Sequence, residues 1–509
     1  MKKLLQSSLL VLIASIITKM GGLLREVTLA WAFKTGTVTD AFVISFALPT
    51  LLLSFISGGV GVTYISTYNN AQGDRKRFTN SLLTMFFFIA LALAAVMAAS
   101  PSAFIRMLAS GFDAATEQTA ASMLRYMAWA VIPILMCSLV SAHLQAHGKF
   151  FAATIYHVFN NLFTIIGIFI ARSTSTMYVI GMMMVVGNCV SMGYLFYSSK
   201  GAELRYKPMF DFNSPQMRGF FVLLAPIVLS SVIGQVNQIV IQNVASSFDK
   251  GTISQLNYAH KVQGVFTAFI GTAVATSFYP QLTKSAGDNK EFKTNIGNAL
   301  RLLLPLLLPI AVGMLILAEP VVRIIYERGQ YSRENTVQTA SLLRFYTLTM
   351  VTSSLSQIVT RAFYARSRTK LPAVVAMMSV AVNVACIFMF RGALGARGLA
   401  LAAGVSGFVG LAVLYGFLTR EVGAIGGVEW WKLLGSVGIM GAFVWVGARF
   451  MPLMTGSYAR CLVMTGLLVG CAVLLYAVLL VAFRMEAATT GILFLKRWVN
   501  KKKRVSIGM

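Results

Sequence analysis

Three charged residues lie within one long hydrophobic segment near the start of this chain. Lys19, Arg25 and Glu26 fall inside a run from about residue 4 to residue 33 that contains no turn signal. A charge at that depth in a bilayer costs on the order of several kcal/mol unless it faces a partner or a water-filled cavity. The three residues therefore predict a buried site for a charged ligand.

The spacing of these charges favours one shared cavity. At about 3.6 residues per turn, Lys19 and Glu26 point nearly the same way, and Arg25 is turned roughly 100 degrees to one side. A bend at Gly21 and Gly22 would bring all three toward one cavity. In the alternative interpretation, Lys19 and Glu26 neutralise each other and Arg25 reaches back to the membrane surface.

Two later residues extend this candidate site. Lys261 lies inside another hydrophobic span, where it either completes an anion clamp with Arg25 or reaches to the membrane surface. Apart from Glu26, no carboxylate lies well inside a span, so a proton relay of buried acids has little to build on. Asp40 begins the second hydrophobic segment and is expected to cap that helix rather than to bind a ligand.

The composition shows that membrane helices must position these residues. Of 509 residues, 57% are hydrophobic and 12% are charged, and the mean hydropathy is +0.74. A helix needs about 20 apolar residues to span the bilayer. About fourteen stretches meet this requirement, near 4–33, 41–66, 79–99, 121–143, 151–171, 177–197, 216–245, 253–281, 297–318, 336–361, 371–390, 396–418, 431–450 and 460–483. We therefore predict an all-α polytopic membrane protein.

Basic residues predict the orientation of the chain. Short loops rich in Lys and Arg stay in the cytoplasm, and the even-numbered connections are the basic ones when both termini are cytoplasmic. Much of the net charge of +27 is then explained by basic residues that fix the orientation of the helices and that attract anionic lipid headgroups. The basic residues are scattered among loops, which argues against a nucleic-acid partner. They are Arg75, Lys76, Arg77, Lys149, Lys200, Arg205, Lys207, Lys284, Lys290, Lys293, Arg361, Arg366, Arg368 and Lys370, with Lys501, Lys502, Lys503 and Arg504 in the tail.

An internal repeat predicts two similar halves. The segment 33–39 (FKTGTVT) joins the first two spans, and 248–254 (FDKGTIS) joins the seventh and eighth. Gly73-Asp74 and Gly287-Asp288 continue the similarity, one residue out of step. Six helices separate the copies, so the two halves share one orientation and resemble a rocking transporter. We predict six-helix lobes at 1–200 and 201–420, followed by two further helices and a basic tail at 421–509.

Enzyme and metal motifs are lacking. His143 and His147 have the spacing of a metal pair but no third ligand nearby. The five cysteines all fall within hydrophobic spans, without metal-ligand spacing. No phosphate-binding loop, nucleophile elbow or H-E-x-x-H occurs in the sequence. We therefore expect a transporter without a cofactor or a metal, rather than an enzyme.

Five stretches of the chain form a recognisable pattern. They are 19–26 (KMGGLLRE) with 36–42 (GTVTDAF), 144–150 (LQAHGKF) with Asn161, 257–261 (NYAHK) with Tyr279 and Pro280, and 326–331 (YERGQY). They resemble the MurJ (MviN) lipid II flippases of the multidrug/oligosaccharidyl-lipid/polysaccharide exporter superfamily. The resemblance covers nearly the whole chain. Relatives that export drugs usually have twelve helices, so a count of fourteen favours the MurJ branch.

The resemblance implies a flippase of the bacterial inner (plasma) membrane that moves undecaprenyl-pyrophosphate-linked peptidoglycan precursor between leaflets by alternating access. Arg25 and Lys261 match cationic positions of the family's cavity and would hold the pyrophosphate. Lys19 and Glu26 match charged positions of the first helix, and Asp40 matches an acidic position where it would cap or gate.

The chain also departs from the family pattern. Leu53, Ser54 and Gly58 stand where many members have two arginines and a glutamate, so at least one cavity cation is missing. The family implies coupling to membrane potential or to a monovalent cation. Gln235, Asn237 and Asn383 are polar candidates without a carboxylate, and no sodium site is assigned. Another polyprenyl-linked glycan is the alternative substrate, and a cation-coupled drug exporter and an enzyme of lipid metabolism are more distant alternatives.

Overall fold

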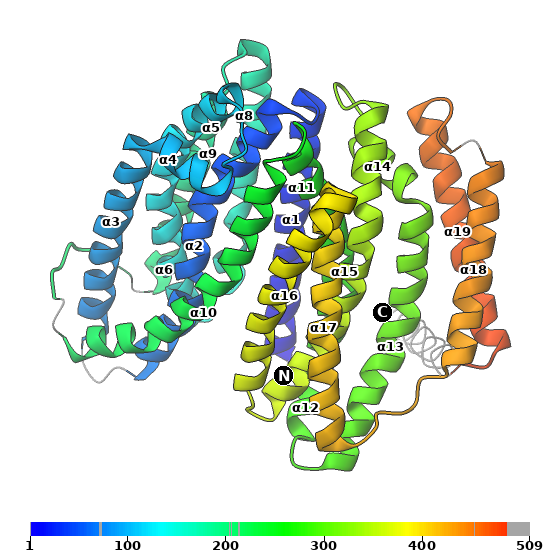
Figure 1. Cartoon of the computed structure of the whole chain (residues 1–509). Helices are drawn as coiled ribbons and strands as arrows, with labels where there is room; N and C mark the ends of the chain where they lie inside the picture. Colours follow the sequence, from blue (N-terminus) through cyan, green and yellow to red (C-terminus); the bar gives the residue numbers. More distant parts are fainter. Residues whose placement is uncertain are drawn as a thin grey trace, which may run out of the picture. The chain divides into compact units, whose positions relative to one another are not determined.

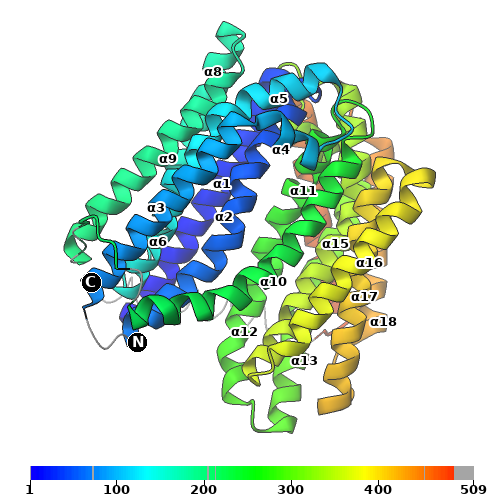
Figure 2. The ribbon, with the colours of Figure 1, turned by 60° about the vertical axis from the view of Figure 1, so that its left-hand side comes forward.

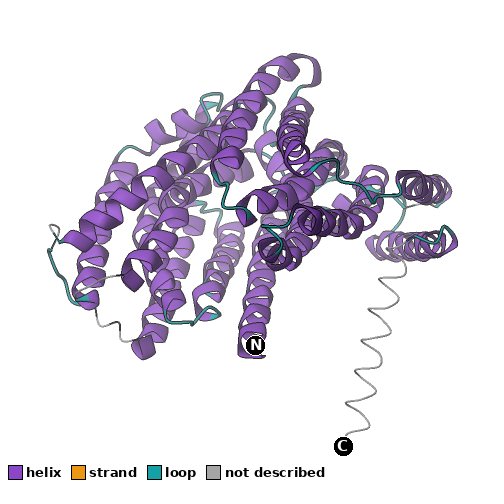
Figure 3. Cartoon of the chain, turned by 90° about the horizontal axis from the view of Figure 1, so that it is seen from below, coloured by secondary structure: helices purple, strands orange, loops and turns teal. Residues whose placement is uncertain are grey.

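The computed structural model describes residues 2–70, 74–202, 204, 206–211, 214–451 and 453–485. These residues form helices joined by short connections, with no strand among them (Figures 1 and 3). Helices are the expected solution for so apolar a chain, because a helix satisfies its own backbone hydrogen bonds where no water is available. The all-helical prediction is confirmed.

The first half of the chain contains the following elements: α1 (Lys2–Phe33), α2 (Thr37–Asn70), α3 (Arg75–Ala99), α4 (Pro101–Leu108), α5 (Ala114–Met127), η1 (Ala128–Ala130), α6 (Val131–Ala146), α7 (Ala152–Ile155), α8 (His157–Thr174), α9 (Tyr178–Ser199), η2 (Lys200–Ala202) and α10 (Pro215–Ala245). α5, η1 and α6 follow one another without a gap, so together they form one long crossing segment.

The second half continues with α11 (Thr252–Thr267), η3 (Ala268–Thr272), α12 (Ala273–Lys284), α13 (Asn289–Ile316), α14 (Ala318–Tyr326), α15 (Arg333–Ala365), α16 (Lys370–Leu394), α17 (Ala396–Val422), α18 (Trp430–Phe450) and α19 (Tyr458–Ala482). The segment η3 is a π-helical turn between α11 and α12, which again form one continuous crossing segment.

The number of crossing segments agrees with the sequence. Ten segments of the described chain are long and apolar enough to cross a membrane. The helices α1, α2, α10 and α15 are 31 to 34 residues long and bring the number to about fourteen. The short helices α4 and α14 each follow a crossing helix directly.

The repeated Gly-Asp pairs start equivalent helices. Asp74 precedes α3, and its carboxylate accepts hydrogen bonds from the backbone of Lys76 at 2.9 Å and of Arg77 at 3.1 Å. Asp288 precedes α13 and accepts from the backbone of Lys290 at 2.8 Å. Each aspartate satisfies backbone donors that a helix leaves open at its start. The internal repeat seen in the sequence is therefore also a repeat of local structure.

The described residues group into two compact units. The first unit comprises Met1–Tyr258 and Tyr326–Asn335, and the second comprises Ala259–Ile325 and Thr336–Met509. The division into 1–200, 201–420 and 421–509 remains a prediction. The basic tail at 501–504 lies outside the described residues.

Within the first unit, α2 is central. It packs against α5, α6 and α10, and α10 is visibly bent in two views (Figures 1 and 2). α1 packs against α8. The core includes fully buried aromatic side chains, among them Phe42, Tyr64 and Phe220. This packing holds α1 and the start of α2 in place, and these two segments carry most of the predicted site.

The second unit has its own apolar core. Leucine, isoleucine and phenylalanine side chains of α13 pack there with residues of α15, α17, α18 and α19. The Tyr476 hydroxyl of α19 donates to the Pro305 carbonyl of α13 at 2.9 Å. The Pro305 carbonyl lacks its usual intrahelical donor, because the residue four positions later is Pro309, which has no N–H group. The last two helices are therefore attached to this unit by polar as well as apolar contacts.

Candidate functional site

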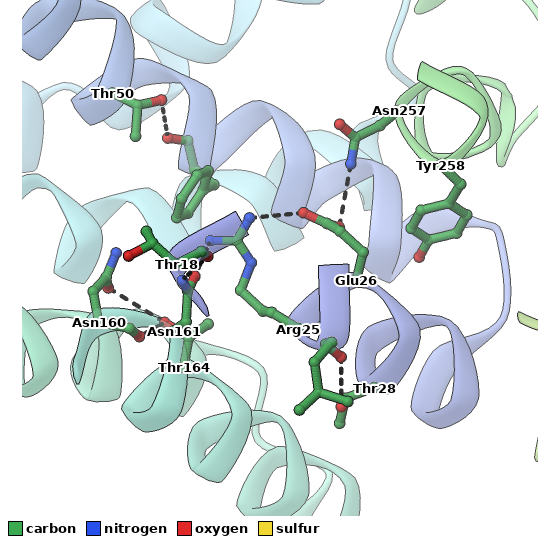
Figure 4. Close-up of polar contacts among 12 residues, drawn as sticks. Thr18, Arg25, Glu26, Thr28, Thr50, Asn160, Asn161, Thr164, Asn257 and Tyr258 are labelled. Carbon is green, nitrogen blue, oxygen red and sulfur yellow. Dashed lines mark hydrogen bonds and ion pairs between the residues drawn. The ribbon is translucent and has the colours of Figure 1, made fainter. Parts of the chain in front are cut away.

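Arg25 and Glu26 form a buried ion pair on α1. Arg25 Nη2 lies 2.7 Å from Glu26 Oε1, and the two side chains are only 5% and 2% exposed. Glu26 Oε2 also accepts from Asn257 Nδ2 of α11 at 3.2 Å (Figure 4). Lys19 is exposed on the same helix and does not join them. The alternative that Lys19 neutralises Glu26 is wrong for this structure, because Glu26 pairs with Arg25. The expectation that all three charges face one cavity stays a prediction.

The guanidinium of Arg25 is only partly satisfied. It lies over the Phe46 ring, 4.1 Å from the ring centroid, and Nη1 is 3.5 Å from Asn161 Oδ1 of α8. Nε has no hydrogen-bond partner although it is buried. Asn161 in turn donates from Nδ2 to the Thr18 carbonyl at 3.4 Å, which fixes its amide (Figure 4). Arg25 thus faces an aromatic ring, a carboxylate and an amide, and its buried Nε–H group has no acceptor.

Asp40 caps a helix, although not its own. Its carboxylate accepts from the backbone N–H of Gly251 at 2.6 Å and of Ser254 at 2.8 Å, at the start of α11. Its own helix is capped by Thr39, whose Oγ1 accepts from the Gly36 backbone at 2.9 Å. The expectation that Asp40 caps α2 is therefore corrected. The carboxylate is buried, and the positive end of the α11 dipole favours its charge.

The two repeated turns meet at this carboxylate. Thr39 Oγ1 donates to Ser254 Oγ at 3.2 Å, and Gln255 Nε2 donates to Thr35 Oγ1 at 3.3 Å. A Cβ on Gly251 would lie 3.0 Å from Thr35, so the close approach requires glycine at this positive φ. We call the interlocked residues 35–40 and 251–255 the paired turns.

The segment Tyr326–Asn335 packs beside the paired turns. Thr35 Oγ1 donates to Asn335 Oδ1 at 2.8 Å, and the Trp31 carbonyl accepts from the Gln330 backbone at 3.1 Å. Trp31 is itself held by Arg172 of α8, whose guanidinium lies 3.8 Å from the ring centroid. The ends of α1 and α2 are therefore closed by residues from much later in the chain.

A tyrosine cluster lies next to Glu26. The rings of Tyr258 and Tyr326 stack with centroids 4.8 Å apart, and Tyr331 packs against both. All three side chains are buried, and the Tyr258 hydroxyl has no hydrogen-bond partner. Apolar rings around a buried ion pair exclude water, which strengthens the Arg25–Glu26 attraction.

Lys261 belongs to the second unit. It lies on α11 and is partly exposed. A joint clamp by Arg25 and Lys261 therefore stays a prediction. The side chains at 53, 54 and 58, where the family pattern is broken, lie outside the described residues.

His143 and His147 take part in hydrogen bonds. His143 Nδ1 is 2.8 Å from the Tyr64 hydroxyl, and Nε2 is 2.9 Å from the Ala202 carbonyl. His147 Nδ1 is 2.9 Å from the His143 carbonyl. No group of three or more potential metal ligands occurs in the described part of the chain. His143 therefore joins α6 to α2 and to η2, which directly follows α9.

Sequence reasoning missed the partners of the charged residues. Asn257, Asn161, Trp31 and Arg172 were not assigned roles, although the first two belong to the stretches that resemble the family. The contacts join residues that are far apart in the sequence: 136 positions separate Arg25 from Asn161, and 231 positions separate Glu26 from Asn257. Local sequence patterns do not predict contacts over such separations. An asparagine inside a hydrophobic span was the one usable signal, because a buried amide needs a polar partner.

Known proteins match this chain over most of its length. The family model described as "Lipid II flippase MurJ" matches residues 29–465. The probable lipid II flippase MurJ of Rickettsia prowazekii is 27% identical over 434 residues, covering 82% of this chain and 84% of that protein. The lipid II flippase MurJ of Burkholderia cenocepacia is 24% identical over 480 residues, covering 88% and 93%.

Solved structures show the same fold. A lipid II flippase MurJ in an inward closed conformation aligns with a TM-score of 0.82 at 24% identity, covering 94% of this chain and 99% of that one. An inward-facing multidrug resistance MATE family transporter of the MOP superfamily aligns with a TM-score of 0.67 at 14% identity, covering 82% and 98%. Since the family model spans most of the sequence, this chain belongs to the lipid II flippase MurJ family.

Proposed function

We propose that this chain moves lipid II, the undecaprenyl-pyrophosphate-linked peptidoglycan precursor, from the inner to the outer leaflet of the bacterial inner membrane. Membership of the MurJ family supports the substrate. The step is transport by alternating access and makes or breaks no covalent bond. Both termini are placed in the cytoplasm, as the distribution of basic loops predicts.

The observation that carries the proposal is the buried guanidinium of Arg25, which is only partly satisfied. Its Nε–H has no acceptor, and an unmet buried donor costs about 1–3 kcal/mol. A phosphate oxygen would accept this hydrogen bond, and arginine presents its donors in a fork that matches phosphate geometry. The site is therefore suited to an oxyanion that arrives with the substrate.

Glu26 has a specific part in this scheme. Its carboxylate occupies Arg25 Nη2 and also accepts from Asn257, so it stands where an anionic substrate group would bind. An incoming pyrophosphate would displace Glu26 from Arg25 and would weaken its hold on α11. Binding of the substrate would then loosen a contact between α1 and α11.

Lys261 and Lys19 supply the remaining charge. Lys261 would add a point charge to the Arg25 fork on the pyrophosphate. Lys19 is exposed on α1 and would raise the local potential for an anion rather than touch it.

Asp40 is proposed as a gating residue. The paired turns join the starts of α2 and α11 through its buried carboxylate. Alternating access requires these contacts to break when the outer side opens. The charge of Asp40 therefore stabilises the closed state of that side, on the orientation proposed above.

A flippase for another polyprenyl-linked glycan is the alternative, because a pyrophosphate clamp does not by itself select the sugar. A drug exporter is less consistent with a site in which the buried carboxylate of Glu26 is already paired with arginine and that of Asp40 already accepts two backbone hydrogen bonds. Coupling to membrane potential or to a monovalent cation also remains a proposal. Asn383 is a buried amide of α16, but it lacks a carboxylate beside it in sequence.

The test is translocation of labelled lipid II in cells depleted of their own flippase. Three variants are compared with the parent protein: Arg25→Ala, Arg25→Lys and the control Arg218→Ala, which changes an exposed arginine of α10. The parent and the control should restore translocation. Arg25→Ala should abolish it, and Arg25→Lys should restore it partly, since it keeps the charge and loses the fork.

Expression and thermal melting must accompany the assay, because removing one partner of a buried ion pair costs about 3–5 kcal/mol. The double variant Arg25→Ala, Glu26→Ala removes both charges and restores stability without restoring the fork. Full translocation by a well-expressed Arg25 variant would contradict the clamp. No translocation by the well-expressed parent would contradict the substrate and favour another polyprenyl-linked glycan.

A further inference from the structure

A second repeated segment pairs two arginines that the proposed transport step does not use. Residues 121–126 read ASMLRY on α5, and residues 340–345 read ASLLRF on α15. Pro101 precedes Arg125 by as many positions as Pro320 precedes Arg344. Both prolines lie in the first turn of a short helix, Pro101 as the first residue of α4 and Pro320 as the third residue of α14. Arg125 and Arg344 are therefore equivalent positions of the internal repeat.

In the second unit, this arginine has an internal carboxylate. Arg344 Nη2 lies 2.9 Å from Glu319 Oε1, and Nε donates to the Leu315 carbonyl at 3.3 Å. Glu319 directly precedes Pro320 at the start of α14. The charge of this arginine is thus balanced within its own repeat.

In the first unit, the equivalent carboxylate is missing. Ser100 directly precedes Pro101, at the position that corresponds to Glu319. Its hydroxyl does not cap α4. Arg125 is exposed and forms no ion pair or hydrogen bond with the residues that the structure describes. The first copy of the repeat therefore has the arginine, Arg125, without a carboxylate at the position equivalent to Glu319.

A pocket of about 640 Å³ occupies the resulting space. It lies between the start of α4 and one face of α5, and Arg125, Gln118, Ser100 and Ser102 all line it. Alanines at neighbouring positions leave the space open. Glu117 and Arg106 also line the pocket. They form an ion pair in which Arg106 Nε–H is shared between the two Glu117 oxygens, at 2.9 and 3.0 Å, so the charge of Glu117 is balanced by Arg106. The pocket therefore offers the guanidinium of Arg125 with hydroxyl and amide donors, and its one carboxylate is already paired.

Aromatic side chains place this pocket at a membrane surface. Tyr126 and Trp129 follow Arg125 on the same segment and are exposed. Tyr126 stacks on the exposed Tyr178 of α9, with ring centroids 5.0 Å apart. Exposed tyrosine and tryptophan gather at the level of the lipid headgroups. The phosphates of membrane lipids lie at this same level.

We propose that this pocket binds the phosphate of a membrane phospholipid, with Arg125 as the principal ligand and Ser100 and Gln118 as further donors. The lipid would take the place that Glu319 fills in the second repeat. On the orientation proposed above, it is a lipid of the outer leaflet. The binding itself does not depend on the identity of the transported substrate.

The test is native mass spectrometry of the purified full chain, titrated with phosphatidylglycerol or with diacylglycerol, which has similar chains without a phosphate. The variants are Arg125→Gln, which removes the cation, and Ser100→Glu, which supplies the carboxylate found in the second repeat. Arg449→Gln, at an exposed arginine of α18, is the matched control. Thermal melting checks that Ser100→Glu stays folded.

We expect the parent and Arg449→Gln to retain one phosphatidylglycerol that both pocket variants bind about tenfold more weakly, as loss of a charge-assisted contact implies. Equal retention by the parent, Arg125→Gln and Ser100→Glu would overturn the proposal. Retention of diacylglycerol at the same site would also overturn it. Displacement of the lipid by millimolar inorganic phosphate, dependent on Arg125, would reassign the pocket to a soluble anion.

Discussion

Replacing Asp40 with asparagine tests whether one buried carboxylate holds the paired turns together. The carboxylate accepts two backbone hydrogen bonds, at 2.6 and 2.8 Å, from the start of α11. Hydrogen bonds to a charged group contribute about 1.5–3 kcal/mol each, and the charge at the helix start contributes about 0.3–1 kcal/mol more. An asparagine has the same size, but it retains only one acceptor atom and carries no charge.

The loss is therefore about 3 kcal/mol, which is one of the two charged hydrogen bonds and the interaction with the helix dipole. Since 1.4 kcal/mol corresponds to a tenfold change, the open state of the paired turns should become about 150-fold more populated. Amide hydrogen exchange of the peptide that contains Gly251 and Ser254 should accelerate by a similar factor, because these two N–H groups donate to Asp40.

Asp113→Asn is the matched control. Asp113 forms an ion pair with Lys250, next to the same turn, at 3.1 Å, but both side chains are largely exposed. Exposed ion pairs contribute little to stability, so exchange in the 251–254 peptide should hardly change. Unchanged protection in Asp40→Asn would refute the reasoning. An equal acceleration in both variants would also refute it, because the effect would then not depend on the buried carboxylate.

Three further predictions concern other contacts of the described chain. Gly329→Ala should lower the melting temperature in detergent, because Gly329 has a φ of 63° and its new Cβ would lie 2.5 Å from the Trp31 carbonyl; an unchanged melting temperature would show that the Trp31 contact is not needed. Hydrogen bonds from Thr116 and Lys250 lower the pKa of Asp113 in the folded protein. The ionised Asp113 side chain therefore stabilises the fold above the usual aspartate pKa of about 3.9. This stabilisation is lost as the pH falls through the lower pKa of the folded protein. Carboxyl NMR should find that Asp113 titrates below the usual aspartate pKa in the parent protein and nearer to it in Lys250→Ala. Titration of Asp113 at the usual aspartate pKa in the parent would contradict the ion pair. Arg323→Met should speed proteolysis between α18 and α19 several-fold, since Arg323 donates to the carbonyls of Leu453 at 3.2 Å and Gly456 at 2.8 Å; cleavage at the parental rate would show that these two bonds do not hold the connection.

Much of the fold could be predicted from the sequence because the bilayer restricts the choices. Long apolar segments must be helices, and their number follows from the length needed to cross. Boundaries marked by a capping residue were also accessible, as at Asp74 and Asp288. The equivalence of the two turns at 33–39 and 248–254 was visible as well. Their direct contact was not visible, because similarity between two segments says nothing about the distance between them.

The candidate site was only partly predictable. Arg25 and Glu26 were identified because a charge in an apolar span needs a reason. Helical periodicity paired Glu26 with Lys19, whereas the structure pairs it with its immediate neighbour Arg25. Long side chains of adjacent residues can bend toward each other when packing confines them, and periodicity describes only where each Cβ points.

The sequence by itself determined which residues are charged inside the membrane, how many helices cross it and which family the chain resembles. Those features depend on local composition and on the cost of burying charge, which act on each segment separately. Only the tertiary structure decided that Asp40 caps α11, that Asn257 holds Glu26, and that Arg125 lines an open pocket whereas Arg344 pairs with Glu319. These are contacts between segments far apart in the chain, and packing selects them from many pairings that the sequence alone allows.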